Sequence, residues 1–560
     1  MIKMKYRFKV SGIYFLIAVI VGLVSCKPRM PQPPLAKKTG IALTGKGDLK
    51  GDPYLWMEDK NDSALQIYIL LENEYAEKYS GLHGELLKKL SLEMAMRADP
   101  LLISDALPRK KNTKEVQTGD GKFKLSVNDR RQVIAHFEKN GKEEHQPVYE
   151  ETTPGFGVYV GLSKSQRYFF IISNDGHSSE TRVLPADLSN LKPFLIQPWE
   201  KGIRYTVEHF GSDIFWILTN NNAPNRKLMQ AMVSHPEEKF WVSVAPNRDS
   251  IYLEDFSLLD ERYLVLLERQ NPGVGIRLYD RDHNDEGAIY FKEPDGALQV
   301  SDYDPERGKI LLRYTSLLSP VTIYEYDIKT GRLGIRKKTG IKNYSKSDYS
   351  SERLWARSSD GFKILITLVY KNGLGKTDGS NPLLLSVNTG ESSSDDPLKF
   401  NAAFISLLDR GFYIAKVYVR QENASDDYLQ GIDFLLRQKI TSKGLITGIG
   451  SGEGALLLGN VMNLHPEIFK VILLDKVEGK TGSPGFPYDN IKEQAYPAIM
   501  ITASTDSGFQ SSGPYKLAAK LRASNTGDRP LLIRSSKTEG TNDHSPFFCT
   551  FLLDEYEINP

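Results

Sequence analysis

Regular spacing of apolar side chains divides the chain into three parts from about residue 51 onward. Between residues 51 and 100, apolar positions recur every three or four residues, as at Leu65, Tyr68 and Ile69. This spacing places such side chains on one face of a helix. The segment is therefore predicted to be helical and to pack that face against another part of the protein.

Short apolar runs separated by turn residues follow between residues 101 and 341. Examples are residues 168–172, 214–218 and 263–267, and a turn signal occupies residues 174–176. Many short strands of even length predict either a pair of β-sandwiches or a β-propeller with about 40–45 residues per blade. No sharp repeat motif is visible, so the pattern alone leaves both architectures open.

Apolar strands alternate with helical stretches over residues 342–560. Residues 364–370 and 471–474 are predicted strands, and residues 455–463 are a predicted helix. Such alternation is typical of a parallel sheet with helices as crossover connections. We therefore expect an α/β domain at the C-terminal end.

The N-terminus has the pattern of a secretory signal. Four basic residues within positions 3–9 precede an apolar run over residues 10–24, which is shorter than a typical membrane span. The run ends in Leu23-Val24-Ser25-Cys26, which resembles a bacterial lipoprotein cleavage box. This resemblance implies a signal peptide over residues 1–25 and a lipid, palmitate, on Cys26. A cleaved signal with a coincidental cysteine and an uncleaved anchor are the alternatives.

A segment rich in Pro and Gly over residues 26–50 is predicted to be a flexible tether. Lys27 follows the cysteine, and lipoprotein sorting rules imply that the absence of Asp there favours the outer membrane of a Gram-negative bacterium. Removal of residues 1–26 lowers the formal charge from +2 to −2. The mature chain is therefore expected to be slightly acidic and anchored to the cell envelope.

Composition excludes several classes of protein. The chain has 560 residues, 72 Lys and Arg against 70 Asp and Glu, and two cysteines. This balance offers no clustered basic face for nucleic acid. Cys26 and Cys549 are too few for a disulfide scaffold or a thiolate metal site. No two histidines show metal-ligand spacing, so the sequence predicts neither a metal nor a cofactor.

A glycine-rich segment near residue 450 carries the most specific chemical signal. An apolar strand predicted over residues 444–447 leads through Gly450-Ser451-Gly452-Glu453-Gly454 into a helix, which is the context of a G-x-S-x-G nucleophile elbow. In that register the central residue is Gly452, and Ser451 lies one position early. A phosphate-binding loop is the rival interpretation, but the segment lacks a following Lys-Ser/Thr and the dinucleotide spacing.

Motifs along most of the mature chain resemble the prolyl oligopeptidase family of serine peptidases, especially the oligopeptidase B branch. The matching segments include residues 52–59, 72–75, 267–269, 352–356, 407–412 and 487–491. The resemblance implies a seven-bladed β-propeller over residues 101–341 and a doubly wound α/β-hydrolase domain over residues 342–560. It also implies that the N-terminal helices pack on the hydrolase domain.

The resemblance places the family's catalytic residues on positions that are mostly changed. Gly452 falls at the serine, Asp506 at the triad aspartate and Thr541 at the histidine. Asn388 falls at the tyrosine that helps to form the oxyanion hole. Removal of the serine or the histidine from such a triad lowers turnover by about six orders of magnitude. The resemblance therefore implies a catalytically inactive member of the family.

A relocated catalytic set is an alternative. Ser451 neighbours the centre of the elbow, and His544 lies three residues beyond Thr541, so Ser451, Asp506 and His544 could form an unorthodox triad. Adjacent residues of an extended segment point in different directions, and a misplacement of about 1 Å can lower the rate a hundredfold. The relocated triad is the less favoured interpretation.

The sequence thus predicts a lipid-anchored, catalytically inactive oligopeptidase-like protein of the bacterial cell envelope. Its partners are expected to be the membrane, through Cys26, and either an envelope protein or a peptide. It would act as an interaction subunit or as a peptide-binding protein. The alternative is an active serine oligopeptidase that cleaves short peptides.

Overall fold

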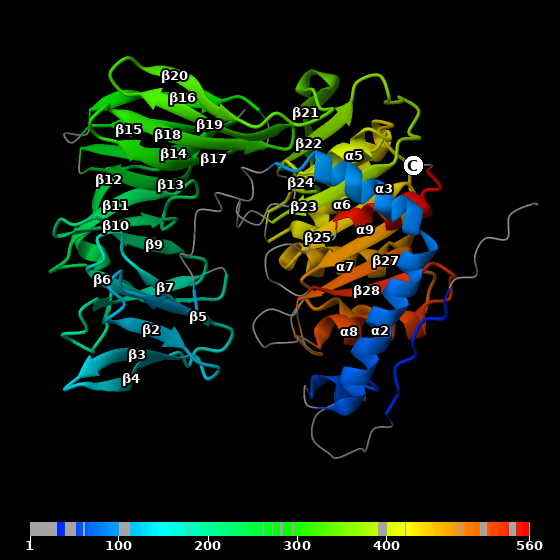
Figure 1. Cartoon of the computed structure of the whole chain (residues 1–560), viewed down its shortest axis with the longest axis horizontal. Coiled ribbons are helices and arrows are strands. Elements are labelled where there is room, and N and C mark those ends of the chain that lie inside the picture. The colour runs from blue at the N-terminus through cyan, green and yellow to red at the C-terminus, as the bar shows by residue number, and fades with distance from the viewer. Residues whose placement is uncertain are drawn as a thin grey trace, which may run out of the picture.

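The structure is a computed structural model in which two bodies lie side by side (Figure 1). One is a stack of small sheets, and the other is a large sheet covered by helices. The structure describes residues 31–39, 52–59, 62–99, 113–176, 178–260, 262–270, 273–280, 284–293, 296–389, 400–420, 422–477, 479, 481–483, 485–504, 512–536 and 545–558.

The stack consists of five four-stranded antiparallel sheets, here called blades 1 to 5 in chain order. Blades 1 and 2 comprise β1 (Glu115–Gln117), β2 (Lys124–Val127), β3 (Gln132–Lys139), β4 (Lys142–Glu150), β5 (Gly157–Leu162), β6 (Tyr168–Asn174), β7 (Ser179–Pro185) and β8 (Phe194–Leu195). Blade 3 comprises β9 (Tyr205–His209), β10 (Ile214–Thr219), β11 (Lys227–Met232) and β12 (Val242–Ala245). Blades 4 and 5 comprise β13 (Ile251–Leu259), β14 (Tyr263–Gln270), β15 (Gly273–Tyr279), β16 (Asp285–Phe291), β17 (Ala297–Asp304), β18 (Lys309–Ser316), β19 (Ser319–Asp327) and β20 (Arg332–Lys338).

The blades form an open stack. Apolar clusters fill the junctions between blades 1 and 2, 2 and 3, 3 and 4, and 4 and 5. Among the described residues no such cluster joins blade 5 to blade 1, and β4 and β20 lie at opposite ends of the stack in Figure 1. The apolar faces of the blades therefore pack only against the blades that come directly before or after them in the chain.

The number of blades corrects the expectation drawn from the family resemblance. Seven blades were implied, whereas the described residues between 115 and 338 form five. The reason is chain length, because seven blades of about 40–45 residues need about 300 residues. The propeller-type architecture is confirmed, and its blade count is five in the part of the chain that the structure describes.

The second body is built on one mixed eight-stranded sheet, with strand order β21-β22-β24-β23-β25-β26-β27-β28. The two pairings made by β22 are antiparallel, and the strands from β24 to β28 run parallel. The strands are β21 (Tyr349–Arg357), β22 (Lys363–Lys371), β23 (Leu383–Asn388), β24 (Tyr413–Tyr418), β25 (Ile446–Ser451), β26 (Phe469–Asp475), β27 (Ala498–Ser504) and β28 (Leu531–Ser536).

Helices cover both faces of this sheet, which makes it doubly wound, as expected. Buried side chains of α6, α7 and α8 join one apolar cluster, and those of α3, α5 and α9 join another. The helices are α5 (Ala402–Leu408), α6 (Ala424–Arg437), α7 (Glu453–Leu464), α8 (Gly513–Ser524) and α9 (Ser545–Glu555). Short 3-10 turns are η1 (Leu55–Glu58), η2 (Glu238–Phe240), η3 (Lys346–Asp348), η5 (Pro466–Ile468) and η6 (Pro487–Asn490).

Two N-terminal helices, α2 (Ser63–Leu82) and α3 (Gly84–Met96), lie along this second body and not along the blades (Figure 1). The carboxylate of Asp62 caps α2 by accepting a hydrogen bond from the amide of Ala64 at 2.8 Å. Leu65, Tyr68 and Ile69 are buried, so the apolar face that the sequence predicts is the face that packs.

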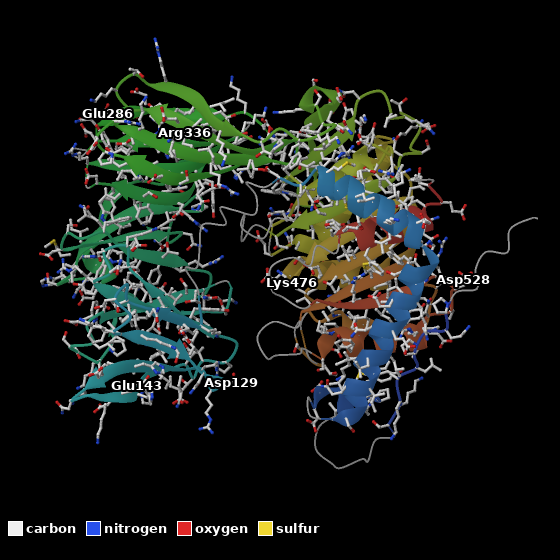
Figure 2. The ribbon with its side chains drawn as sticks, in the orientation of Figure 1. Asp129, Glu143, Glu286, Arg336, Lys476 and Asp528 are labelled. Atoms are coloured by element: carbon white, nitrogen blue, oxygen red, sulfur yellow. The ribbon has the colours of Figure 1, made fainter. Side chains whose placement is uncertain are left out.

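Blade 5 attaches the stack to the second body. The amide of Val321 donates to the carboxylate of Asp99 at 2.7 Å, and the hydroxyl of Tyr344 donates to the carbonyl of Leu318 at 2.5 Å. Leu318 belongs to the same apolar cluster as α3 and α9. Blade 1 is at the far end of the stack, where Figure 2 labels Glu143, while Arg336 marks the opposite end.

Candidate functional site

The turn between β25 and α7 has the geometry of a nucleophile elbow. Gly452 follows the last residue of β25, adopts φ +55° and ψ −120°, and is followed at once by α7. L-residues rarely adopt this backbone conformation, and a strained turn of this kind exposes the nucleophile at the top of an α/β-hydrolase sheet. The residue at its tip has no side chain, so the position carries no nucleophile.

The two flanking glycines allow the turn to close. A Cβ atom on Gly450 would lie 2.4 Å from the carbonyl oxygen of Gly454, and one on Gly454 would lie 3.1 Å from Cγ1 of Val387. A Cβ atom on Gly452, in contrast, would have no described heavy atom within 4 Å. The turn therefore needs glycine at position 450, where the obstacle is backbone. At position 454 a Cβ atom would press on the side chain of Val387, whereas position 452 has room for a side chain.

Ser451 lies beside the tip of the turn and is bound to an aspartate. Its hydroxyl donates a hydrogen bond to Oδ2 of Asp475 at 2.8 Å, and Oδ1 of the same carboxylate accepts from the hydroxyl of Thr502. Ser451, Asp475 and Thr502 are register partners on β25, β26 and β27, at the carboxyl edge of the sheet. A carboxylate lacks the imidazole chemistry that activates the hydroxyl of a serine peptidase.

Asn388 ends β23, which runs parallel to β25. Its carbonyl accepts from the amide of Val419 at 3.0 Å. The carboxyl ends of parallel strands meet at one edge of the sheet, so Asn388 and the elbow share this edge. A Cβ atom on residue 454 would lie 3.1 Å from Cγ1 of Val387, so the end of β23 is directly beside the turn.

Several predicted site residues lie outside the described residues. They are the lipidation candidate Cys26, Asp506, Thr541 and His544. Their assignments therefore remain predictions. Asp475 and Thr502 were missed by the sequence reasoning, although Asp475 directly follows a run of apolar strand residues. Polar residues at the carboxyl end of a parallel strand are the signal that would have found it.

One group of potential metal ligands occurs in the described part of the chain. His136, Glu143 and His145 of blade 1 bring ligand atoms within 4.8 Å of one another. The sequence predicts no metal site from histidine spacing, and these two histidines are nine positions apart. Strand pairing between β3 and β4, and not spacing along a helix, brings them together.

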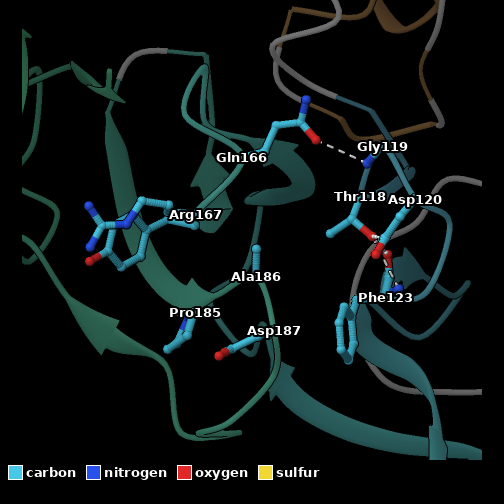
Figure 3. A pocket seen from close by; sticks show the side chains of 10 residues that line it. Thr118, Gly119, Asp120, Phe123, Gln166, Arg167, Pro185, Ala186 and Asp187 are labelled. Carbon is cyan, nitrogen blue, oxygen red and sulfur yellow. Dashed lines mark hydrogen bonds between the residues drawn. The ribbon is translucent and has the colours of Figure 1, made fainter. Parts of the chain in front are cut away.

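Two cavities lie in the stack of blades. The first, of about 780 Å³, lies between blades 1 and 2 and is lined by residues such as Phe123, Gln166 and Asp187 (Figure 3). The second, of about 760 Å³, is lined by residues of β5, β9, β13 and β17, the first strands of blades 2 to 5. Because it crosses four blades, we call it the inner groove, and Thr206, Phe256 and Gln299 are among its lining residues.

These features define a class of protein, a β-propeller joined to an α/β-hydrolase domain whose elbow carries glycine. Residues 110–339 match the family model described as "Prolyl oligopeptidase, N-terminal beta-propeller domain". The chain belongs to the prolyl oligopeptidase family.

Similar proteins include peptidases and cover most of the chain. Dipeptidyl aminopeptidase BI of Pseudoxanthomonas mexicana is 30% identical over 472 residues, which are 75% of this chain and 64% of that protein. Protease 2 of Moraxella lacunata is 26% identical over 477 residues, which are 75% of this chain and 68% of that protein. The chain thus spans slightly less than two thirds of the length of the first of these relatives.

Solved structures show the same fold. Oligopeptidase B from Leishmania major superposes with a TM-score of 0.76 at 19% identity, covering 94% of this chain and 99% of that one. Oligopeptidase B from Trypanosoma brucei with covalently bound antipain gives the same TM-score and identity. The fold expected from the sequence, a propeller plus a doubly wound α/β-hydrolase domain, is therefore confirmed.

Proposed function

We propose that this chain is a non-hydrolysing member of the prolyl oligopeptidase family that binds peptides at the cell envelope. The observation that carries the proposal is Gly452, which occupies the tip of the elbow where the nucleophile of a serine peptidase belongs. Acyl transfer needs a hydroxyl or thiol at that point and a base within hydrogen-bonding distance of it. A glycine supplies neither the nucleophile nor a proton to transfer.

The neighbouring hydroxyl is a poor substitute. Ser451 is the last residue of β25, and its hydrogen is directed to Asp475 along the carboxyl edge of the sheet. A carboxylate in this position holds the hydroxyl in place without the imidazole that a serine nucleophile needs for activation at neutral pH. The Ser451 hydroxyl thus has a structural role in joining β25 to β26.

Peptide binding is supported by the inner groove. The groove has a volume of about 760 Å³ and offers both apolar and polar lining residues, among them Phe256, Arg226 and Gln299. Concave sites of about 300–1,000 Å³ with mixed lining are typical of ligand binding. Loss of the nucleophile leaves such a surface unaltered, so a protein of this kind can retain peptides after hydrolysis has been lost.

The expected result for the purified full chain is retention of peptides without cleavage. Wild-type protein and Ser451→Ala should hydrolyse a mixture of peptides of 6–20 residues no faster than buffer, and a fluorophosphonate should label neither. Mass spectrometry of peptides retained after gel filtration should find them intact. Thr206→Trp, which fills the inner groove from an exposed position, should reduce retention, while Ser234→Trp, at an exposed position outside the groove lining, should not.

Two outcomes would overturn this proposal. Labelling of Ser451 by the fluorophosphonate, together with amidolysis that disappears in Ser451→Ala, would show an active serine oligopeptidase. An absence of retained peptides, with a stoichiometric protein that co-purifies from membranes instead, would favour an interaction subunit. An active prolyl oligopeptidase in the same assay verifies that the substrate mixture is cleavable.

We further propose that the lipid on Cys26 places the protein in the envelope. The basic n-region, the apolar run and Cys26 support this anchor. No helix in the described residues meets the length and hydropathy expected of a bilayer-spanning segment. Cys26→Ser is expected to abolish incorporation of radiolabelled palmitate and to move the protein from the membrane pellet to the soluble fraction. Cys549→Ser, at the other cysteine, should change neither, and membrane retention of Cys26→Ser would contradict a lipid anchor.

A further inference from the structure

The face of blade 1 that points away from blade 2 is polar. Along β3, Val133 and Ala135 are buried in the cluster shared with blade 2, so the alternation of a strand turns His136 to the other face. Ser126 on β2 lies on this same face, since its hydroxyl is 2.7 Å from Nε2 of His136. Terminal units of stacked repeats carry polar outer faces, and blade 1 is such a unit in this open stack.

A tight turn fixes which residues of β3 and β4 oppose each other. Asn140 and Gly141 have φ of +54° and +74°, the left-handed conformation required by a two-residue hairpin turn. This turn sets His136 directly opposite His145 in the antiparallel register. The pairing therefore follows from the Asn-Gly dipeptide and does not depend on distant parts of the chain.

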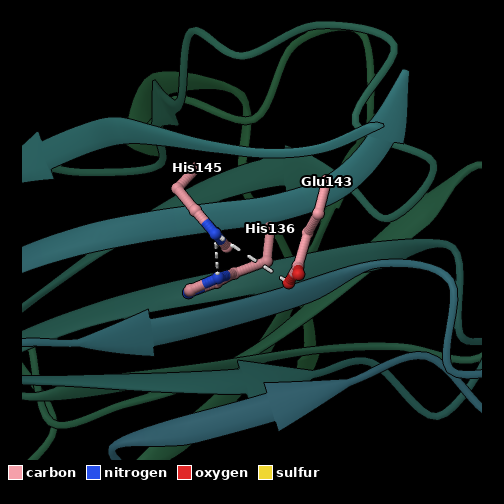
Figure 4. A group of neighbouring side chains, drawn as sticks. All are labelled: His136, Glu143 and His145. Atoms are coloured by element: carbon pink, nitrogen blue, oxygen red, sulfur yellow. Dashed lines mark hydrogen bonds and ion pairs between the residues drawn. The ribbon is translucent and has the colours of Figure 1, made fainter. Parts of the chain in front are cut away.

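The two imidazole rings converge on each other. Nδ1 of His136 lies 2.7 Å from Nδ1 of His145, and Nε2 of His145 lies 4.0 Å from Oε1 of Glu143 (Figure 4). The rings are tilted by 72° with centroids 4.8 Å apart, so their nitrogen lone pairs can point to one place between them. The hydroxyl of Ser126 is hydrogen-bonded to Nε2 of His136 and fixes the orientation of the ring, as the hydrogen-bond partners of metal-ligating histidines do.

Negative charge at the same face favours a cation. Glu138 and Glu143 are register partners on β3 and β4, and both are exposed. Like charges that face each other across two strands are destabilising. The ammonium group of the neighbouring Lys124 pairs with Glu115 at 2.8 Å, so its positive charge is directed to that residue and not to the two opposed glutamates.

We propose that His136, His145 and Glu143 bind one divalent transition-metal ion of the zinc class on the outer face of blade 1. Two imidazole nitrogens and one carboxylate are a common set of three protein ligands for Zn²⁺, which leaves a fourth position for water. Ligands about 2.0–2.1 Å from a tetrahedral ion lie about 3.3 Å apart, so the two Nδ1 atoms need to separate by only about 0.6 Å. The bound ion links β4, an edge strand whose first six residues are exposed, to β3.

The test is titration of the full chain, prepared without a polyhistidine tag, with ZnCl₂ by calorimetry. We expect one Zn²⁺ per chain, no response to CaCl₂, and slower amide exchange of residues 142–146 in the zinc-loaded protein. His145→Gln should weaken zinc binding about tenfold or more, and Glu143→Gln should weaken it less. His235→Gln, an exposed histidine of blade 3 that bonds to Ser234, is the matched control and should bind zinc as the wild type does.

Weak binding of several ions, unaffected by His145→Gln, would overturn the site. So would a single tight site that His136→Gln and His145→Gln leave intact, because the ligands would then lie elsewhere. Both glutamine variants alter partly or fully exposed positions, and their far-ultraviolet circular dichroism should match the wild type. These outcomes are independent of peptide retention, so failure of the metal site and failure of the proposed function are distinguishable.

Discussion

Replacement of Glu72 by alanine is expected to lower the free energy of unfolding of the α/β-hydrolase domain by about 3–5 kcal/mol. Glu72 is fully buried on α2 and receives two hydrogen bonds from the guanidinium of Arg522 on α8, at 2.5 and 3.1 Å. Burial acts to lower the pKa of Arg522, but the hydrogen bond and charge of Glu72 outweigh it and raise the pKa overall. Removal of the carboxylate leaves a buried guanidinium without its counter-charge.

A buried thiol reports this unfolding. Cys549 is fully buried in α9 and, in a Cys26→Ser background, is the single cysteine of the chain. The rate at which a maleimide labels this thiol at increasing urea concentrations measures the opening of the hydrolase domain alone. A measurement on the whole chain would mix this opening with that of the blades, and a two-state treatment would not hold. The midpoint of labelling should move to lower urea in Glu72→Ala.

Glu74→Ala is the matched control on the same helix. Glu74 is exposed and pairs with Lys78 four residues later at 2.8 Å, an arrangement that contributes about 0.3–0.5 kcal/mol. Its urea midpoint should stay close to that of the parent. Equal shifts for the two variants would mean that α2 contributes little through the buried ion pair and that its docking depends on apolar contacts alone.

The buried position of Glu72 was predictable, but its partner was not. The three- and four-residue spacing of Leu65, Tyr68 and Ile69 places Glu72 on the same helical face, which the structure buries. Arg522 lies 450 positions further along the chain, and only the folded contact between α2 and the C-terminal part of the sheet brings the two together. Local periodicity thus predicts the buried face of a helix and says nothing about what that face meets.

The blades show a similar division. The short strands and turn signals predicted a sheet-rich region, and the resemblance to the family selected a propeller from the two architectures left open. The number seven was carried over from the family, whereas the length of this region allows five blades. The outer face of blade 1 carries polar side chains such as His136 and Glu138. That these side chains lie at an uncovered end of the stack can be predicted only when the register of the hairpin is known.

The end of strand β25 at the elbow was predicted too early because glycines lie there. The sequence predicts a strand that ends at residue 447, while β25 continues to Ser451 through Gly448 and Gly450. Glycine has low strand propensity, so pattern reasoning ends a strand where glycines begin. The bond from Ser451 to Asp475 depends on the parallel register of β25 and β26, which a single strand does not reveal.

The two glycines of this turn should respond very differently to alanine. Gly450→Ala is expected to lower the urea midpoint of Cys549 labelling by an amount equivalent to about 3 kcal/mol or more, because its Cβ would lie 2.4 Å from a backbone carbonyl of α7. Relief of that overlap requires the first turn of α7 to move away from β25. Gly452→Ala has no described atom within 4 Å of its Cβ and should cost about 1–2 kcal/mol through its positive φ alone.

This comparison separates two explanations for the missing nucleophile. If the two losses of stability differ as expected, position 452 has room for a side chain. Packing then does not require glycine at this position, and the nucleophile is missing for a reason other than space. If Gly452→Ala unfolds the domain as readily as Gly450→Ala, the turn has been remodelled so that no side chain fits at its tip. In that case a serine could not be restored by substitution at position 452 without further changes to the surrounding loops, since the backbone itself would exclude it.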